Sequence, residues 1–186
     1  YYTHENIGYG PVNLPDQELH TTAVWWQLPQ RVLDRCFDSR EDALDGFLGA
    51  AYALHLVAMV SVMAEGRDLQ KAVGSGDGAW FVAADLGGRG QLRSAEDGSV
   101  APDEVRGFTP TIFLYDNHPG GVGLSLPLFE RREELRQHAL GLVRGCACKA
   151  GCPGCVGPVL ASAEVDDGTT AKAAALTVLK LLGESA

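Results

Sequence analysis

The chain has 186 residues, of which 46% are hydrophobic and 21% are charged, and these values are ordinary for a globular protein. This length suits one domain, or one domain with a small appendage, and it allows a substantial hydrophobic core. A formal net charge of −9 argues against a protein that binds nucleic acid over its whole surface.

The N-terminal region predicts an irregular strand and turn over residues 1–14 and a second strand over residues 20–28, which is rich in β-branched and aromatic residues. These segments are expected to pair as a hairpin across Pro15. Trp25 and Trp26 point to opposite faces of an extended chain, so one is expected in the core and the other on an exposed or interdomain surface.

A long helix is predicted from a cap at Ser39 to about Ala64, with Gly66 ending it. Its second half is apolar nearly all round, which is typical of a buried central helix. The uncharged stretch over residues 47–64 reaches the length of a membrane span. It contains polar and small residues, however, so we favour a buried helix on which His55 is a core histidine.

From Arg67 the chain becomes polar and rich in glycine. A strand is predicted over residues 79–86, and residues 87–107 are expected to form a long polar loop or loose hairpin. Loops of this length are uncommon in compact domains, so residues 74–107 are interpreted as an insertion or a flexible loop. Residues 109–115 (TPTIFLY) predict a buried strand.

A glycine-rich segment, residues 116–125 (DNHPGGVGLS), follows this strand. Turns of this kind bind phosphate where a helix N-terminus presents free N–H groups. Neither a P-loop lysine nor G-x-G-x-x-G spacing is present. We therefore favour glycines that allow close backbone packing, with Asp116 and Asn117 making local turn bonds.

Two further helices are predicted, one capped by Ser125 and ended by Gly145, the other over residues 169–182. The pattern predicts a single α+β domain over residues 1–186. We expect a small mixed or antiparallel sheet that packs on the central buried helix. A Cys₄ zinc knuckle is expected to follow a long helix.

The strongest chemical signal is a C-x-C-x3-C-x2-C cluster formed by Cys146, Cys148, Cys152 and Cys155. Four thiolates close a tetrahedral zinc site and leave no position for substrate, so such a site is structural. A Pro-Gly pair between the last two cysteines suits a tight turn, with glycine accepting a positive φ. Two disulfides are a weaker alternative, because they would close small strained loops. An iron–sulfur cluster stays open as an alternative.

Three basic residues, Arg136, Arg144 and Lys149, lie in a stretch, residues 135–163, that has no aspartate or glutamate. A contact with a DNA backbone is expected there if the chain makes one. The alternative is that these side chains are simply solvated around an anionic metal site. The fifth cysteine, Cys36, is expected to be a core or free thiol that is dispensable for metal, and the cysteine usage suits a reducing compartment.

Residues 115–158 together carry YD-x-x-PGG-x-G-L-S, a charged helix and C-x-C-x2-GCP-x-C. This combination resembles the C-terminal zinc-binding domain of MrfA-type (YprA-type) superfamily 2 DNA helicases. Softer matches lie in Tyr2-Thr3-His4-Glu5 and in Ala53-Leu54-His55. The resemblance spans most of the chain and is weakest between residues 74 and 107.

The resemblance implies an accessory domain of an ATP-dependent 3′→5′ DNA helicase that acts in repair, with the four clustered cysteines as ligands of one zinc ion. It implies motor domains, DNA and a nuclease as partners, no membrane, and a cytoplasmic location at the nucleoid. The chain has no signal-peptide pattern and begins at Tyr1, so a piece of a longer protein is expected. It lacks a Walker A lysine motif and a DEAD/DEAH box, so no ATPase activity is expected of it alone. A stand-alone zinc-binding adaptor of a DNA-processing complex and an iron–sulfur redox switch are the alternatives.

Overall fold

The computed structural model describes residues 18–75, 80–81, 92–93, 109–158 and 169–184. The predicted segment at residues 1–14 and its hairpin across Pro15 lie outside the described residues, as do most of the strand at residues 79–86 and all of the loop at residues 87–107 except residues 92–93.

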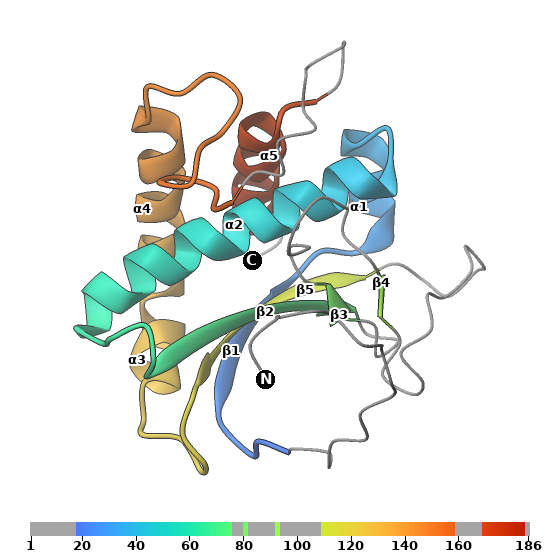
Figure 1. The fold of residues 1–186 in the computed structure, drawn as a ribbon. Helices are drawn as coiled ribbons and strands as arrows, with labels where there is room; N and C mark the ends of the chain where they lie inside the picture. Colours follow the sequence, from blue (N-terminus) through green and yellow to red (C-terminus); the bar gives the residue numbers. More distant parts are fainter. Residues whose placement is uncertain (1–17, 76–79, 82–91, 94–108, 159–168, 185–186) are drawn as a thin grey trace, which may run out of the picture.

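Within the described part of the chain, five antiparallel strands form one sheet in the order β1-β5-β2-β3-β4 (Figure 1). The three longer strands are β1 (Ala23–Gln27), β5 (Pro110–Asp116) and β2 (Leu69–Ser75). The remaining two, β3 (Trp80–Phe81) and β4 (Leu92–Arg93), have two residues each. The predicted α+β class is confirmed, and of the two predicted kinds of sheet the antiparallel one is present.

Strands β1 and β5 confirm the two strand predictions made from β-branched and aromatic residues, although β1 is shorter than predicted. They pair directly, with Trp26 opposite Ile112. The alternation in β1 separates the two tryptophans as predicted, because Trp26 is 9% exposed in the core whereas Trp25 is 62% exposed. Trp25 is therefore the side chain that faces outward.

Strand β2 was not predicted, because the sequence after Arg67 showed only a polar, glycine-rich composition. It pairs along its whole length with β5, from Leu69 opposite Asp116 to Ser75 opposite Pro110. The described buried large apolar side chains of β2 are Leu69 and Val73. This strand therefore carries a weak local pattern, and its pairing with the strongly apolar β5 determines its structure.

Helix α2 (Arg40–Val62) is the predicted central helix, and it lies across one face of the sheet (Figure 1). Ser39 caps it, because the Asp42 N–H donates to Ser39 Oγ at 3.0 Å. The helix ends at Met63, which has a left-handed φ of 52°, rather than at Gly66. By length and composition α2 would suit a membrane span, but most of that stretch is buried inside the fold.

His55 lies on α2 and is buried, as predicted for a core histidine. Its Nε2 is 2.8 Å from the Leu69 carbonyl oxygen, which can only accept a hydrogen bond. Burial lowers the pKa of His55. The ring therefore donates a hydrogen bond that joins the central helix to the start of β2.

The remaining helices are α1 (Gln30–Cys36), α3 (Ser125–Glu130), α4 (Arg132–Gly145) and α5 (Ala171–Glu184). The sequence analysis missed α1. It also predicted one helix from Ser125 to Gly145, whereas the backbone breaks at Arg131, whose φ of −98° and ψ of 14° leave the helical region. Ser125 is the first residue of α3 rather than its cap. The Arg131 guanidinium donates to the Ser61 carbonyl at the end of α2, so a tertiary contact holds the break.

Helices α4 and α5 pack against α2 and against each other (Figure 1). Gly46 allows α5 to approach α2 closely, because a Cβ at this position would lie 2.9 Å from the Ala174 carbonyl oxygen. Gly49 has the same role in the next turn of α2, where a Cβ would lie 3.0 Å from Ala175 and 3.2 Å from Val156. Both α5 and the chain segment that follows the cysteine cluster therefore pack closely against the central helix.

Candidate metal centre

The end of α4 delivers the first cysteine of the cluster. Cys146 is the C-cap of this helix, and its φ of −67° and ψ of 134° turn the chain into an extended segment. Gly151, with φ of 122°, reverses the chain before Cys152. A loop of about ten residues therefore returns to the place where α4 ended, and it brings all four cysteines to one point.

The predicted tight turn between Cys152 and Cys155 is present. The Cys155 N–H donates to the Cys152 carbonyl at 3.0 Å, and Pro153 and Gly154 occupy the two central positions. The predicted role of Gly154 is wrong in one respect, because the positive φ values of this loop lie at Gly151 and Gly157. The turn therefore needs Pro153 for its shape more than it needs a left-handed glycine.

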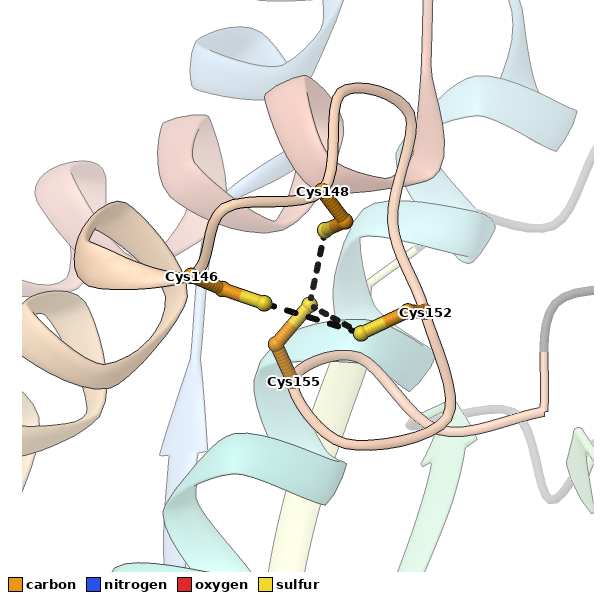
Figure 2. A group of neighbouring side chains, drawn as sticks. All are labelled: Cys146, Cys148, Cys152 and Cys155. Carbon is orange, nitrogen blue, oxygen red and sulfur yellow. Dashed lines mark hydrogen bonds between the residues drawn. The ribbon is translucent and has the colours of Figure 1, made fainter.

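The four thiols point toward a common centre (Figure 2). All four sulfur atoms lie within 4.8 Å of one another. The Cys146–Cys152, Cys148–Cys155 and Cys152–Cys155 sulfur pairs are 3.6, 3.5 and 3.6 Å apart. These separations are much longer than the bond of about 2.05 Å in a disulfide. All four are free thiols, so the structure does not have the predicted alternative of two disulfides.

The spacing of the sulfurs fits a single tetrahedral metal ion. A Zn–S distance of about 2.3 Å places the sulfurs of a regular tetrahedron about 3.8 Å apart. Three of the six sulfur separations, at 3.5–3.6 Å, are close to that value, and all six are within 4.8 Å. The four sulfur atoms therefore lie close to the positions that they would take around a small thiophilic cation. Four sulfurs would complete the tetrahedral coordination shell of that ion.

The environment of the thiols is uneven. Cys155 is 1% exposed and belongs to the hydrophobic core, whereas the other three are half-buried. Burial raises the pKa of the Cys155 thiol to about 12. The backbone N–H of Cys148 and the neighbouring thiols lower the pKa of Cys146 to about 7. Because ligands bind as thiolates, metal binding at this cluster is coupled to proton release.

The cluster is joined to the core on its C-terminal side. Val156 is buried against Gly49 of α2. Gly157 has φ of 85°, and a Cβ there would lie 2.9 Å from the Tyr52 ring. The loop therefore packs directly on the central helix, and order in the cluster and order in the core depend on each other.

The structure separates the three basic residues predicted as DNA contacts. Arg144 and Lys149 are exposed near the cluster. Arg136 is 7% exposed, and its Nη1 donates to the Leu179 carbonyl of α5 at 2.8 Å. Its other nitrogens pair with Glu133 and lower the pKa of that carboxyl group to about 2. Because this guanidinium joins α4 to α5 in the interior, it is not available to a phosphate backbone in this structure.

The glycine-rich segment after β5 has a structural role. Asp116 is fully buried, and its Oδ2 accepts hydrogen bonds from the backbone N–H groups of residues 122–124 at 2.8, 2.9 and 3.2 Å. Thr22 of the neighbouring chain segment also donates to this oxygen. The N–H groups that would have faced a phosphate are thus occupied by a carboxylate of the same loop. The interpretation as local turn bonds therefore fits Asp116. It is wrong for Asn117, whose side chain donates to the distant Arg67 carbonyl at 2.9 Å.

The fold and the four-thiol cluster are those of a small Cys₄ metal-binding domain. A family model described as the MrfA Zn-binding domain matches residues 50–156, more than half of the chain. The chain belongs to the MrfA Zn-binding domain family.

Two known proteins show the extent of the similarity. The chain is 32% identical over 155 residues to the uncharacterized ATP-dependent helicase YprA of Bacillus subtilis (strain 168), and the match covers 83% of this chain and 17% of YprA. A shorter match of 45 residues is 42% identical to the uncharacterized protein MJ1572.1 of Methanocaldococcus jannaschii. It covers 24% of this chain and 40% of that protein.

Solved structures extend the likeness to nearly the whole chain. The crystal structure of the DUF1998 helicase MrfA bound to DNA matches 96% of this chain with a TM-score of 0.62 and 32% identity. A second structure, of MrfA bound to DNA and AMPPNP, matches 96% of the chain with a TM-score of 0.54 and 29% identity. The chain spans 19% and 18% of those two chains, so it corresponds to less than a fifth of the helicase.

Proposed function

We propose that this chain is the accessory zinc-binding domain of an ATP-dependent 3′→5′ DNA helicase that acts in DNA repair. In this proposal the motor domains precede the chain in the same polypeptide, and the protein works in the cytoplasm at the nucleoid. The observation that carries the proposal is the four-thiol cluster in a domain of the MrfA Zn-binding family. The match to less than a fifth of two helicases supports the accessory role.

One structural zinc ion is the proposed metal, with Cys146, Cys148, Cys152 and Cys155 as its ligands. Their sulfur separations support a single ion. In a [4Fe–4S] cluster each cysteine binds a different iron atom, so the sulfurs stand further apart. Zinc bound by four thiolates has no open coordination position, and its contribution is therefore folding free energy rather than catalysis.

An exposed apolar surface supports the proposal that the domain braces a motor. Trp25 of β1 and Leu126 and Phe129 of α3 line a groove of about 500 Å³, and each of the three is more than half exposed. Exposed apolar patches of this kind mark protein–protein contacts, and tryptophan is enriched among the residues that carry most of the binding energy. We propose the motor as the occupant, because four fifths of the related helicases lie outside this domain.

A weak contact with single-stranded DNA is the second proposed contribution. Arg144 and Lys149 are exposed beside the cluster, and the stretch that contains them, residues 135–163, has no aspartate or glutamate. Two cations release few counterions, so binding by this domain alone is expected to be weak and sensitive to salt. The proposed role is to guide a strand that the motor holds.

The test combines the isolated chain with the full-length protein. The chain is expected to contain one zinc per molecule, to lack an iron–sulfur absorbance band and to show no ATPase activity. In the full-length protein, Trp25→Ser with Leu126→Ser should lower unwinding, whereas the control Val60→Ser, at an exposed apolar residue of α2, should not. Iron in the chain, ATPase activity in the chain, or full unwinding by a motor without residues 1–186 would each contradict the proposal.

A stand-alone adaptor of a DNA-processing complex is the second candidate. The match to the M. jannaschii protein favours it, because 45 residues make up 40% of that protein, which is therefore shorter than the present chain. Segments of this domain thus occur without room for a helicase motor. The length of the open reading frame that contains Tyr1 decides between the two candidates.

A further inference from the structure

Lys172 connects the first turn of α5 to the half of the cluster that carries the first two cysteines. Its Nζ donates to the Cys146 carbonyl at 2.6 Å and to the Cys148 carbonyl at 2.8 Å. Its backbone N–H donates to the Ala150 carbonyl at 3.0 Å. One residue of a different helix thus satisfies three carbonyl groups within residues 146–150.

We propose that Lys172 is a positioning residue of the metal centre, which holds Cys146 and Cys148 in the geometry for metal and offsets the charge of the thiolates. The proposal rests on the assignment of the four cysteines as metal ligands. It assigns to α5 a role in metal binding that the cysteine spacing does not indicate.

The hydrogen bonds position the ligands. Residues 146–150 leave a helix end and have no strand beside them among the described residues, so their carbonyl groups depend on partners from elsewhere. By fixing the carbonyls of both cysteines, the ammonium group fixes the peptide planes from which their Cβ–Sγ bonds start. Outer-shell groups of this kind typically change metal affinity by about 10–100-fold when they are removed.

The charge of Lys172 has a separate effect. Four thiolates around a divalent cation carry a net charge of −2, and the carbonyl end of α4 adds partial negative charge at Cys146. Lys172 is half-buried, whereas Arg144 and Lys149 are exposed and better screened by water. Among these cations, Lys172 is therefore the one whose charge acts on the site with the least screening.

The contacts also predict how metal acts on the rest of the domain. Helix α5 packs on α2 at Gly46. The hydrogen bonds between Lys172 and the cluster therefore couple metal binding to the packing of these two helices. Metal removal is expected to increase amide hydrogen exchange in the first turn of α5 and in residues 146–157. In a Lys172→Met variant, the exchange of this first turn should no longer respond to metal.

The experiment measures zinc affinity by chelator competition and the thiolate-to-metal charge-transfer band of the Co²⁺-loaded chain. Lys172→Met is compared with Lys180→Met, which removes an exposed lysine from the same helix. Lys172→Met should weaken zinc binding by about 10–100-fold and shift the Co²⁺ band, whereas Lys180→Met should change neither. Lys172→Arg, which keeps the charge and the donors, should recover most of the affinity.

Two outcomes would overturn the inference. One is zinc affinity and a Co²⁺ spectrum of Lys172→Met that match the wild type. The other is full zinc affinity in a Lys172→Gln variant, which keeps a hydrogen-bond donor but lacks the charge. Lys172→Gln also replaces Lys172→Met in the experiment if Lys172→Met does not fold. Cys152→Ser is measured alongside, because loss of zinc there with no effect at Lys172 leaves the metal assignment intact and rejects only the role of Lys172.

Discussion

Two loops of this domain organise their backbone around negatively charged groups, and they differ in what neutralises the charge. In residues 146–157, four thiols converge from one loop, and as thiolates they require a metal ion, which has to come from outside the chain. In residues 116–124, the carboxylate of Asp116 is held by three consecutive backbone N–H groups of the same loop. The first loop depends on an external ligand, whereas the second is complete in itself.

This difference separates two ways of making an irregular segment rigid. Both loops use glycines at positive φ, which cost chain entropy on folding. The Asp116 loop offsets this cost with charge-assisted hydrogen bonds that form whenever the chain folds. The cysteine loop offsets it fully only when metal is bound, so the order of this loop, and of the core residues that pack on it, depends on the metal supply.

The largest expected effect is the loss of a metal ligand. Cys152→Ser should remove zinc binding, and in zinc it should lower the free energy of unfolding toward the metal-free value. That difference is about 4 kcal/mol when free zinc exceeds its dissociation constant about 1,000-fold. Metal analysis and urea denaturation, each with zinc and with chelator, measure the two effects.

The control for this change is Cys36→Ala, at an exposed cysteine outside the cluster. It should keep one zinc per chain and a free energy of unfolding within about 0.5 kcal/mol of the wild type. Full zinc occupancy in Cys152→Ser would contradict the assignment, as would loss of zinc in a folded Cys36→Ala.

The next effect should be independent of metal. Asp116→Asn removes the charge that accepts three N–H groups, and it leaves a buried amide in place of Oδ1, which has no hydrogen-bond partner among the described residues. We expect the free energy of unfolding to fall by about 3 kcal/mol. The decrease should be equal in zinc and in chelator, which is the opposite of the behaviour of Cys152→Ser.

Asn117→Ala is the matched control, because Asn117 is exposed and its side chain donates one hydrogen bond to the Arg67 carbonyl. Its cost should stay below about 1 kcal/mol. If Asp116→Asn were as mild as this control, the carboxylate would not be the centre of the loop.

Sequence patterns predicted the elements of the fold whose own residues determine their structure. The apolar run in β5, the capped helix α2 and the alternation at Trp25 and Trp26 were all predictable on local grounds. Strand β2 was not, because its few buried apolar residues gain their order from pairing with β5. The break at Arg131 was also hidden, since it depends on a contact with the end of α2.

In the candidate site, too, features set by the local sequence were predictable, whereas features set by tertiary contacts were not. The convergence of the cysteines was predictable because short spacing leaves the loop few ways to arrange four thiols. The burial of Arg136 was not, because it depends on α5 packing beside α4, with Gly183 leaving room for the guanidinium. Lys172 was missed for the same reason: no spacing along the chain indicates which helix meets the cluster.

A smaller effect compares one glycine from each loop. Gly157→Ala would place a Cβ 2.9 Å from the Tyr52 ring, and Gly121→Ala would place one 2.6 Å from Thr22 Oγ1. Both positions have positive φ, so each change should cost about 1–2 kcal/mol in backbone strain, besides the contact. In urea denaturation the cost of Gly121→Ala should be the same in zinc and in chelator. The cost of Gly157→Ala should be larger in zinc, and an equal cost in both conditions would contradict the dependence of this loop on metal.

The smallest effect isolates backbone strain from contact in the Asp116 loop. Gly120 has φ of 81°, and a Cβ there would meet nothing within 4 Å, in contrast to Gly121 beside it. Gly120→Ala should therefore lower the free energy of unfolding by about 1 kcal/mol, the strain of the left-handed conformation alone. Gly120→Asn should cost less, because asparagine tolerates this conformation better than alanine. If alanine and asparagine had equal effects in urea denaturation, the cost would have another source than the backbone, and the rigidity of this loop could not be attributed to its glycine geometry.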